Sequence, residues 1–465
     1  MIRMRNHIEG EVTMSQQSMK RIILTLSIAA ALGAGSGSVF ADGGSTVGEL
    51  EARVAELEAM VQQLLNQQAA PREEDCCADA EAAAAAAEEK FNAMMAEHKA
   101  AEAEEEHKHS YKFGGYIKTD AIYSDYSAGS SSGAGRDFYI AGTVPVGPSG
   151  ADGESYFDLH AKESRINFKT NHILDNGAKL GAFVEMDFLL SGQGDERVSN
   201  SFAPRLRHAF LTYNNWLFGQ TWMTFFNVGA LPENLDFVGP AESTIFGRQT
   251  QIRYTMGNWQ FAAENPLTTI TPYGGGARIV ADDSRVPDLV GRYNMSGDWG
   301  AFTVAAILRQ LRYDNGSGGA SDTTESYGVS LSGKFNLGRD DFRWMASMGK
   351  GLGRYLGLNL VNAAVLDADG NLQTIDSWGA FASYRHLWSD QWRSNFTLGY
   401  ASVDNDVALT GSSATKDASS VHVNMIYSPQ PKLDFGFEVM FANREVESGN
   451  DGDLLRFQFS AKYAY

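Results

Sequence analysis

The feature that most constrains the fold is a period of two in residues 111–465, where apolar and polar side chains alternate along many short segments. In the last ten residues, RFQFSAKYAY, Phe457 and Phe459 alternate with Gln458 and Ser460, and the sequence stops on Tyr465. Successive side chains of a strand point to opposite faces, so the pattern predicts strands with one apolar and one polar face. Similar segments recur at 111–126, 179–190, 289–295, 302–309, 392–400 and 433–444.

Two kinds of connection separate these segments. The short ones are 171–177, 295–299, 336–341, 388–391 and 428–432, and the long ones, rich in Gly, Ser and Asp, are 127–153, 191–204, 267–286, 313–323, 357–373, 403–418 and 445–452. Alternating short turns and long loops are typical of outer-membrane barrels. We predict an all-β transmembrane barrel of about sixteen antiparallel strands over residues 111–465, closed by pairing of the last strand with the first, 112–126. A soluble β-sandwich or propeller is the alternative.

The composition agrees with this fold class. The chain has 48 Gly and 52 aromatic residues in 465, and residues 42–465 hold no run of 18 apolar residues of the kind a spanning helix needs. The segment MKRIILTLSIAAALGAGSGSVFA, residues 19–41, has a basic start, a short apolar stretch and small residues before Ala41. It predicts a secretory signal, with 1–18 an over-long start, and an anchor helix as the alternative.

Residues 42–110 form a different region, which we predict to be helical. A heptad seam runs through its first part, with Val and Leu alternating at spacings of three and four, and this pattern predicts a self-associating coiled coil. The seam residues are Val47, Leu50, Val54, Leu57, Val61 and Leu64. Val and Leu in these positions favour two strands in model peptides. Pro71 interrupts the helix, and an Ala- and Glu-rich spacer follows at 78–106.

Two short motifs in this helical region have two interpretations each. Cys76 and Cys77 are adjacent, and in an oxidising compartment they either cross-link chains or stay as thiols. The run EEEHKH, residues 104–109, is either a weak metal site or a solvated charged run, and we favour the charged run. Over half of the net charge of −19 lies in 42–110, and this acidity predicts no nucleic-acid partner.

Sixteen strands make a barrel too wide to be filled by its own side chains, so a water-filled channel is expected. The segment FFNVGALPENLDFVGPAEST, Phe225 to Thr244, is long, irregular and more apolar than the other loops. A loop exposed to water has no need of these apolar side chains, whereas a loop folded into the pore does. We predict that it is a constriction loop, with an ordinary packed surface loop as the alternative.

Alternation places many arginines on the inner face. They are Arg253, Arg292, Arg309, Arg343, Arg385, Arg393, Arg444 and Arg456, together with Arg205 and Arg207, where the alternation is ambiguous. Inner acids are Glu163, Glu185, Asp187, Glu264 and Glu438. Arginine carries a permanent charge and a planar fork that fits carboxylates. The pattern predicts a pore that prefers small anions, unless the arginines pair with the acids and brace the wall.

Catalytic motifs are lacking. The sequence contains no GxSxG, HExxH or Walker loop, and the histidines of the barrel region are scattered. We expect no enzymatic activity, no metal and no cofactor, with a Ser–His–Asn phospholipase as the alternative.

The stretch from Arg205 to Thr255 resembles the DcaP-like family of outer-membrane porins. The pieces that carry the resemblance are RLRHAF, GQTW, PENLDFVGP and RQTQIRY, with SRINFKT and GKGLGRYLGL elsewhere in the barrel region. The resemblance implies constriction-region residues at Gln220, Trp222, Glu233, Asp236, Arg248, Gln251 and Arg253. Asn227 stands where an acid is expected.

The resemblance also implies a homotrimer with one pore per chain, an outer-membrane location with the helical segment in the periplasm, and a preference for dicarboxylates. The expected partners are a second and third copy of the chain, outer-membrane lipid and small anionic solutes. The alternatives are a general porin without preference and a barrel that anchors a periplasmic segment in contact with the cell wall.

Overall fold

The computed structural model describes residues 108–465 apart from 132, 191–193 and 317–320, together with residues 59, 90 and 92–95. The chain divides into two compact units, Met1–Ala96 and Glu97–Tyr465, which are considered separately. In the first unit, residues 92–95 are helical and exposed. The predicted signal segment, the coiled-coil seam and the two cysteines lie outside the described residues, so these remain predictions.

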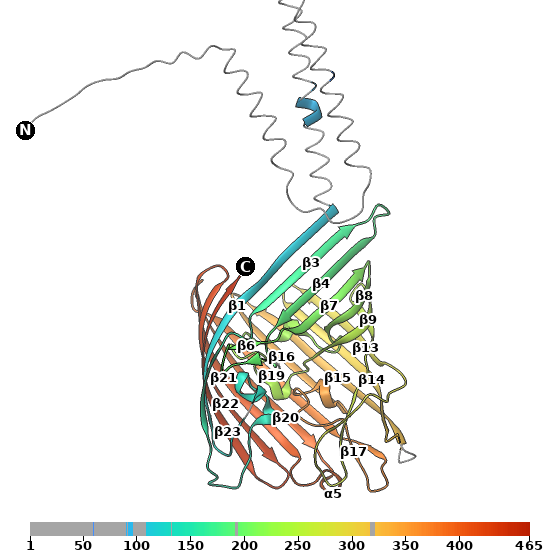
Figure 1. Ribbon diagram of the computed structural model, residues 1–465, viewed down its shortest axis with the longest axis vertical. Helices are drawn as coiled ribbons and strands as arrows, with labels where there is room; N and C mark the ends of the chain where they lie inside the picture. Colours follow the sequence, from blue (N-terminus) through green and yellow to red (C-terminus); the bar gives the residue numbers. More distant parts are fainter. Residues whose placement is uncertain are drawn as a thin grey trace, which may run out of the picture. The chain divides into compact units, whose positions relative to one another are not determined.

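The second unit is built from β-strands (Figure 1). Its main sheet consists of β1 (His109–Tyr126), β2 (Ser155–His160), β3 (Arg165–Ile173), β4 (Lys179–Asp187), β7 (Arg205–Tyr213), β8 (Trp216–Trp222), β9 (Arg248–Met256), β10 (Trp259–Glu264), β13 (Asp288–Gly297), β14 (Gly300–Asp314), β15 (Ser321–Leu337), β16 (Asp340–Lys350), β19 (Asp376–Leu387), β20 (Trp392–Asp404), β21 (Thr415–Gln430), β22 (Leu433–Val446) and β23 (Asp451–Ala464).

The remaining elements are short and lie in the connections. They are α4 (Ala134–Asp137), η1 (Ala141–Thr143), β5 (Gly194–Asp195), β6 (Ser201–Phe202), η2 (Val228–Ala230), η3 (Ala241–Ser243), β11 (Thr268–Thr271), β12 (Ile279–Ala281), η4 (Gly353–Tyr355), β17 (Ala364–Leu366), β18 (Leu372–Thr374) and α5 (Val407–Thr410). None of the helices in the described part of the chain has the length and apolarity to cross a membrane.

The main sheet is a closed antiparallel barrel. Residues 116–126 of β1 pair with 454–464 of β23, which confirms the predicted closure of the first strand against the last. Closure leaves no free edge along this seam, where an unpaired N–H or C=O in lipid would cost several kcal/mol. Figure 1 shows β1 and β23 side by side, with the C-terminus marked beside β1.

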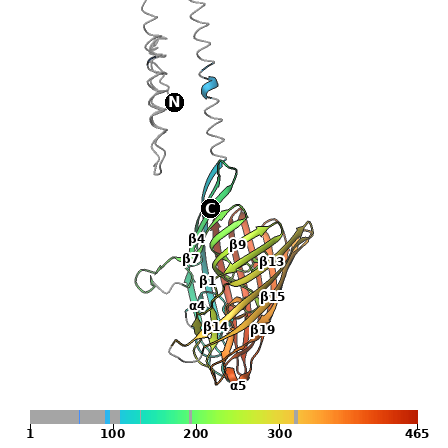
Figure 2. The ribbon, with the colours of Figure 1, turned by 90° about the vertical axis from the view of Figure 1, so that its right-hand side faces the viewer.

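The barrel has sixteen strands in the described residues, as predicted. Seventeen segments belong to the sheet, but β2 and β3 both pair with β1, at residues 120–125 and 109–116 respectively. They are two halves of one strand, interrupted at residues 161–164. The strands slope across the barrel in the view of Figure 2.

The two faces of the wall differ as the alternation predicts. Large apolar side chains on the outside are exposed, with Phe157 at 65 %, Leu308 at 63 % and Met348 at 65 %. On the inside, polar residues such as Ser330 and Thr397 are buried. An apolar outer band with a polar interior is the pattern of a barrel that faces lipid.

Short and long connections alternate around the barrel, close to the predicted boundaries. One feature was not predicted. The long connections 265–287 and 351–375 pair with each other through a parallel contact between β11 and β17, in a four-stranded sheet of their own. Its buried Ile270 and Leu372 form one apolar cluster with Leu311 of β14.

Candidate functional site

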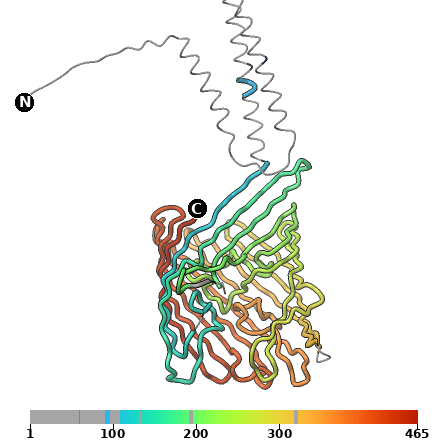
Figure 3. The backbone as a smooth tube through the Cα atoms, in the orientation of Figure 1, coloured from blue at the N-terminus to red at the C-terminus, as the bar shows by residue number. Residues whose placement is uncertain are grey.

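The connection between β8 and β9, residues 223–247, contains the predicted constriction loop, and we call it the inner loop. Its side chains Phe225, Phe226 and Val238 are at most 2 % exposed and join an apolar cluster that includes inward-facing wall residues such as Phe381 and Met440. The apolar residues that distinguish this loop in the sequence are therefore buried against the inside of the wall. The segment can be followed in the interior of the trace in Figure 3.

Glu438 of β22 fixes the middle of the inner loop. Its carboxylate accepts hydrogen bonds from the main-chain N–H groups of Leu235 and Asp236, at 2.8 and 3.3 Å, and from Asn234 Nδ2 at 3.2 Å. Leu235 returns a bond to the wall, because its carbonyl accepts from Lys118 Nζ at 2.8 Å. A loop held by both its donors and its acceptors has a defined position relative to the strands.

Three arginines hold other points of the inner loop. Arg292 Nη1 donates to the Phe226 carbonyl at 2.7 Å, and Arg343 Nη1 donates to the Leu231 carbonyl at 2.6 Å. Arg393 forms a forked ion pair with Glu233, whose shortest N–O distance is 2.6 Å. Part of the predicted arginine set thus braces the loop, whereas the alternative stated from the sequence was that the arginines pair with inner acids and brace the wall.

The buried acids of the inner loop lie in protein rather than in water. The Glu242 carboxylate accepts from Ser420 Oγ at 2.8 Å and is fully buried, and burial raises its pKa to about 7. Burial also raises the pKa of Asp236, whose carboxylate accepts from the N–H of Tyr139 at 2.7 Å. Both acids therefore act mainly as hydrogen-bond acceptors for loop and wall.

A cluster of arginines and aromatic rings lies where the inner loop faces β3, β7 and β9. We call it the arginine–aromatic cluster, and its members are Arg165, Arg205, Arg207, Arg248, Trp222, Phe237 and Phe246. The guanidinium carbons of Arg165, Arg205 and Arg207 lie 5.7, 5.9 and 5.5 Å from the centre of the Phe237 ring. Arg248 lies 4.7 Å from the Trp222 ring. These are cation–π distances.

The arginine–aromatic cluster carries more positive than negative charge. Asp187 accepts from Arg205 and Arg207 at 2.7 Å each, and Glu185 accepts from Arg207 at 2.7 Å. Arg248 has no carboxylate within 4.0 Å in the described part of the chain. Four guanidiniums thus share two carboxylates, which leaves a net charge of about +2 for a solute to meet.

A β-bulge produces the arrangement of Arg205 and Arg207. Met186 of β4 pairs with Leu206, but Glu185 pairs with His208, so Arg207 is an extra residue in β7. Leu206 is 46 % exposed on the outside, whereas Arg207 is fully buried on the inside. The bulge breaks the period of two, which explains why the alternation in RLRHAF is ambiguous.

The other predicted site residues are spread over the inner wall. Gln251 bonds the start of the inner loop, where its Nε2 donates to the Trp222 carbonyl at 2.8 Å, and Gln220 Nε2 donates to the Leu206 carbonyl at 3.2 Å. Arg309 is only 5 % exposed and holds Asp288 at 3.1 Å.

The inward-facing Arg253 forms no hydrogen bond or ion pair with any described residue, and Arg385 pairs with Asp341 at 2.7 Å. The predicted set therefore includes residues that hold the wall together and residues, such as Arg253, that have no carboxylate within 4.0 Å in the described part of the chain.

Three basic residues at the site are missing from the predicted set, and one of them is Lys118, which bonds the Leu235 carbonyl. Arg165 belongs to the cluster, and in SRINFKT the outward Ile166 and Phe168 would have marked it as inward-facing. Lys462 lies with its Nζ 4.5 Å from the centre of the Tyr116 ring. Its inward direction could have been read from the alternation in the final strand.

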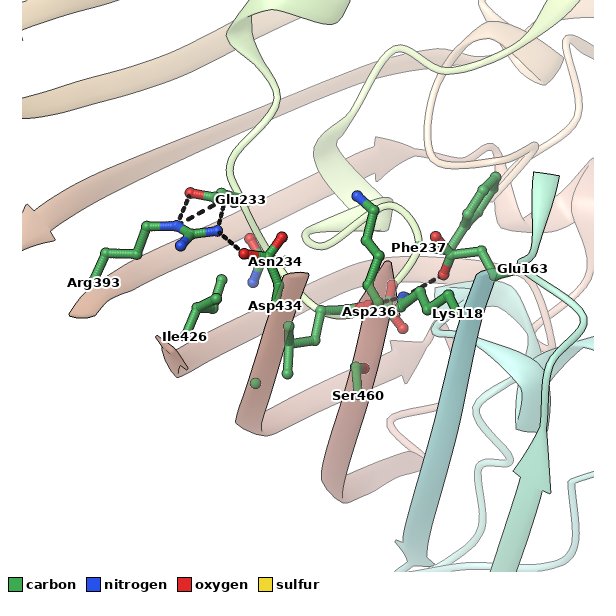
Figure 4. A pocket seen from close by; sticks show the side chains of 13 residues that line it. Lys118, Glu163, Glu233, Asn234, Asp236, Phe237, Arg393, Ile426, Asp434 and Ser460 are labelled. Atoms are coloured by element: carbon green, nitrogen blue, oxygen red, sulfur yellow. Dashed lines mark hydrogen bonds and ion pairs between the residues drawn. The ribbon is translucent and has the colours of Figure 1, made fainter. Parts of the chain in front are cut away.

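A cavity of about 110 Å³ lies beside the inner loop (Figure 4). At one end Arg393 contacts Glu233 and Asp434, and at the other Lys118 pairs with Glu163. Figure 4 shows both groups directed toward the loop segment between them. Since most of these charges are paired with each other, the cavity is nearly neutral and differs from the arginine–aromatic cluster.

Comparisons with known proteins bear on the whole barrel. Residues 51–465 match the family described as the DcaP outer membrane protein. Among solved structures, the outer membrane channel DcaP of Acinetobacter baumannii matches with a TM-score of 0.61 at 22 % identity, over 77 % of this chain and 98 % of that chain. An anion-selective porin from Comamonas acidovorans matches over 77 % of this chain and all of its own, at 12 % identity and a TM-score of 0.47. No curated protein matches the chain significantly.

Proposed function

The chain belongs to the DcaP outer membrane protein family, and from this membership we propose that it is a trimeric outer-membrane porin through which small anions, dicarboxylates among them, diffuse passively. Family and fold make it an outer-membrane channel protein. The preference for anions and the trimer are our inference.

The observation that carries the anion preference is the charge of the arginine–aromatic cluster. Two of its four arginines, Arg205 and Arg207, are neutralised by Asp187 and Glu185, while Arg248 has no such partner. Beyond it, Arg253 and Arg292 on neighbouring inner-wall positions also have no carboxylate within 4.0 Å among the described residues. A solute carboxylate can pair with these groups without displacing a protein acid.

We propose further that the inner loop narrows the pore. Its bonds to the wall support this proposal, since they hold the loop in a defined position inside the barrel at Phe226, Leu231 and Leu235. The passage would then run beside the inner loop, past the arginines of β3, β7 and β9 that contact its aromatic rings. Gln220, Trp222 and Arg248 would lie along this passage, whereas Arg207 is fully buried and paired with Asp187.

Single-channel recording in a planar bilayer tests the proposal. Under a salt gradient we expect three conductance steps per insertion, a reversal potential on the anion side, and block of the current by succinate and by phthalate. A linear conductance without anion preference or block would indicate a general porin. Absence of any conductance from well-folded protein would indicate a barrel with an anchoring role, and would overturn the proposal.

A further inference from the structure

Two histidines from distant parts of the sequence meet at one end of the barrel. His109 begins β1, and His172 lies directly opposite it on β3. Their Nδ1 atoms are 2.8 Å apart, and the centres of the two rings are 5.1 Å apart. The run EEEHKH, which ends at His109, was interpreted as a solvated charged run, but strand pairing adds an imidazole to it that the sequence does not reveal.

The histidine pair lies in a part of the barrel that extends beyond the closing strand. Pairing between β1 and β23 begins at Tyr116, and the Gly115 carbonyl still accepts from the N–H of Tyr465, so residues 109–114 are paired with β3 on one side only. On the outer face, Phe113 lies opposite Phe168 and is 67 % exposed. The next two residues of β1 on this face are Tyr111 and His109. Aromatic residues mark the edge of the lipid region, so the imidazoles lie past this edge.

The geometry suits two ligands on one metal ion. With metal–nitrogen distances of about 2.0–2.1 Å, two adjacent ligands at a right angle lie about 2.9 Å apart, close to the observed separation. Tyr111 packs edge-on against the His172 ring at 5.2 Å, which restricts the ring to this orientation. Imidazole nitrogens favour Zn²⁺, Cu²⁺ and Ni²⁺ over Mg²⁺ and Ca²⁺.

We propose that His109 and His172 bind one divalent transition-metal ion of the zinc and copper class at this end of the barrel. No group of three or more His, Cys, Asp or Glu side chains that could hold a metal occurs among the described residues, so this part of the chain supplies two ligands to the ion. The ion would tie the free end of β1 to β3, since the two histidines belong to different strands.

The experiment is a titration of the purified full-length protein, free of any histidine tag, with Cu²⁺, followed by electron paramagnetic resonance. We expect one equivalent of Cu²⁺ per chain, nitrogen couplings from two imidazoles, and competition by Zn²⁺. His109→Asn and His172→Asn should each weaken binding at least tenfold. His386→Asn is the matched control, because His386 is part-exposed but already bonded to Asp340 at 2.9 Å.

Two results would overturn the proposal. If Cu²⁺ binding persists in His172→Asn and disappears only when the histidines of EEEHKH are replaced, the ligands lie in that run alone. If Zn²⁺ does not slow hydrogen exchange of residues 109–113 and 169–172 in the unaltered protein, the ion does not join the two strands. The exchange measurement needs no variant, so a folding defect in either substitution leaves the test intact.

Discussion

Replacing Glu438 by Ala should release the middle of the inner loop while leaving the barrel closed. Three of the hydrogen bonds that its buried carboxylate accepts come from the loop, namely from Asn234, Leu235 and Asp236. In a channel, the freed donors can bond to water, so each bond is worth about 0.5–1.5 kcal/mol net. The three together contribute about 2–4 kcal/mol, which is a roughly 30- to 700-fold change in the equilibrium for local detachment.

The measurement is hydrogen–deuterium exchange of residues 230–240, with conductance recorded on the same preparation. Exchange should accelerate within that range, and conductance should increase if the loop narrows the pore. Glu445→Gln is the matched control, since Glu445 is on the same strand but pairs with the exposed Lys416. A folded barrel is recognised by the change in its electrophoretic mobility on heating. Unchanged hydrogen exchange in a Glu438→Ala protein that is folded by this criterion would show that the carboxylate does not hold the loop.

Three further predictions concern the same region. Arg248→Gln removes a charge that has no carboxylate partner, and that charge attracts a solute carboxylate at ~5 Å by about 1–3 kcal/mol, so dicarboxylate block in bilayer recordings should weaken roughly tenfold or more. Arg207→Gln instead breaks a buried ion pair with Asp187 and should lower the free energy of unfolding by about 3–5 kcal/mol. Burial raises the pKa of Glu242 from its ordinary 4.5 to about 7, so the loop bound to the wall keeps a proton that a detached loop would lose. Attachment of the loop should therefore weaken as pH rises through about 7. Hydrogen exchange of the loop, corrected for intrinsic rates, should show this pH dependence, and Glu242→Gln should abolish it. Gly399→Ala would place a methyl group against the Glu242 carboxylate, 2.6 Å from Pro240 Cβ. The loop should move away from the wall, and hydrogen exchange around residues 240–243 should accelerate while the barrel stays folded.

The wall of the barrel was predictable because its signal is local. In β22, Phe435 and Phe437 point outward and Glu438 points inward, and this can be read from neighbouring residues alone. The period fails where the backbone leaves the regular strand. At Arg207 one extra residue places two consecutive side chains, Arg207 and His208, on the inside. The ambiguous alternation in RLRHAF reflects this bulge but does not identify the extra residue.

The partners of the inner loop could not be predicted, because they are remote in sequence. The apolar residues of Phe225 to Thr244 indicated that the loop is buried, but Leu235 bonds to Glu438 over 203 positions and Leu231 bonds to Arg343 over 112. A carboxylate on an inward position has the same sequence pattern whether it faces a solute or a main-chain N–H. Only the fold decides which of the two it meets.

The inner-wall arginines therefore differ in what they can do for a solute, although the alternation gives them one pattern. Arg207 and Arg309 are nearly inaccessible and paired with acids, so their removal would leave a buried charge without a partner. Arg248 and Arg253 have no carboxylate within 4.0 Å among the described residues, so a solute anion can pair with them without displacing an acid of the wall. Since charge selectivity depends on uncompensated charge in the passage, it should depend on the second pair far more than on the first.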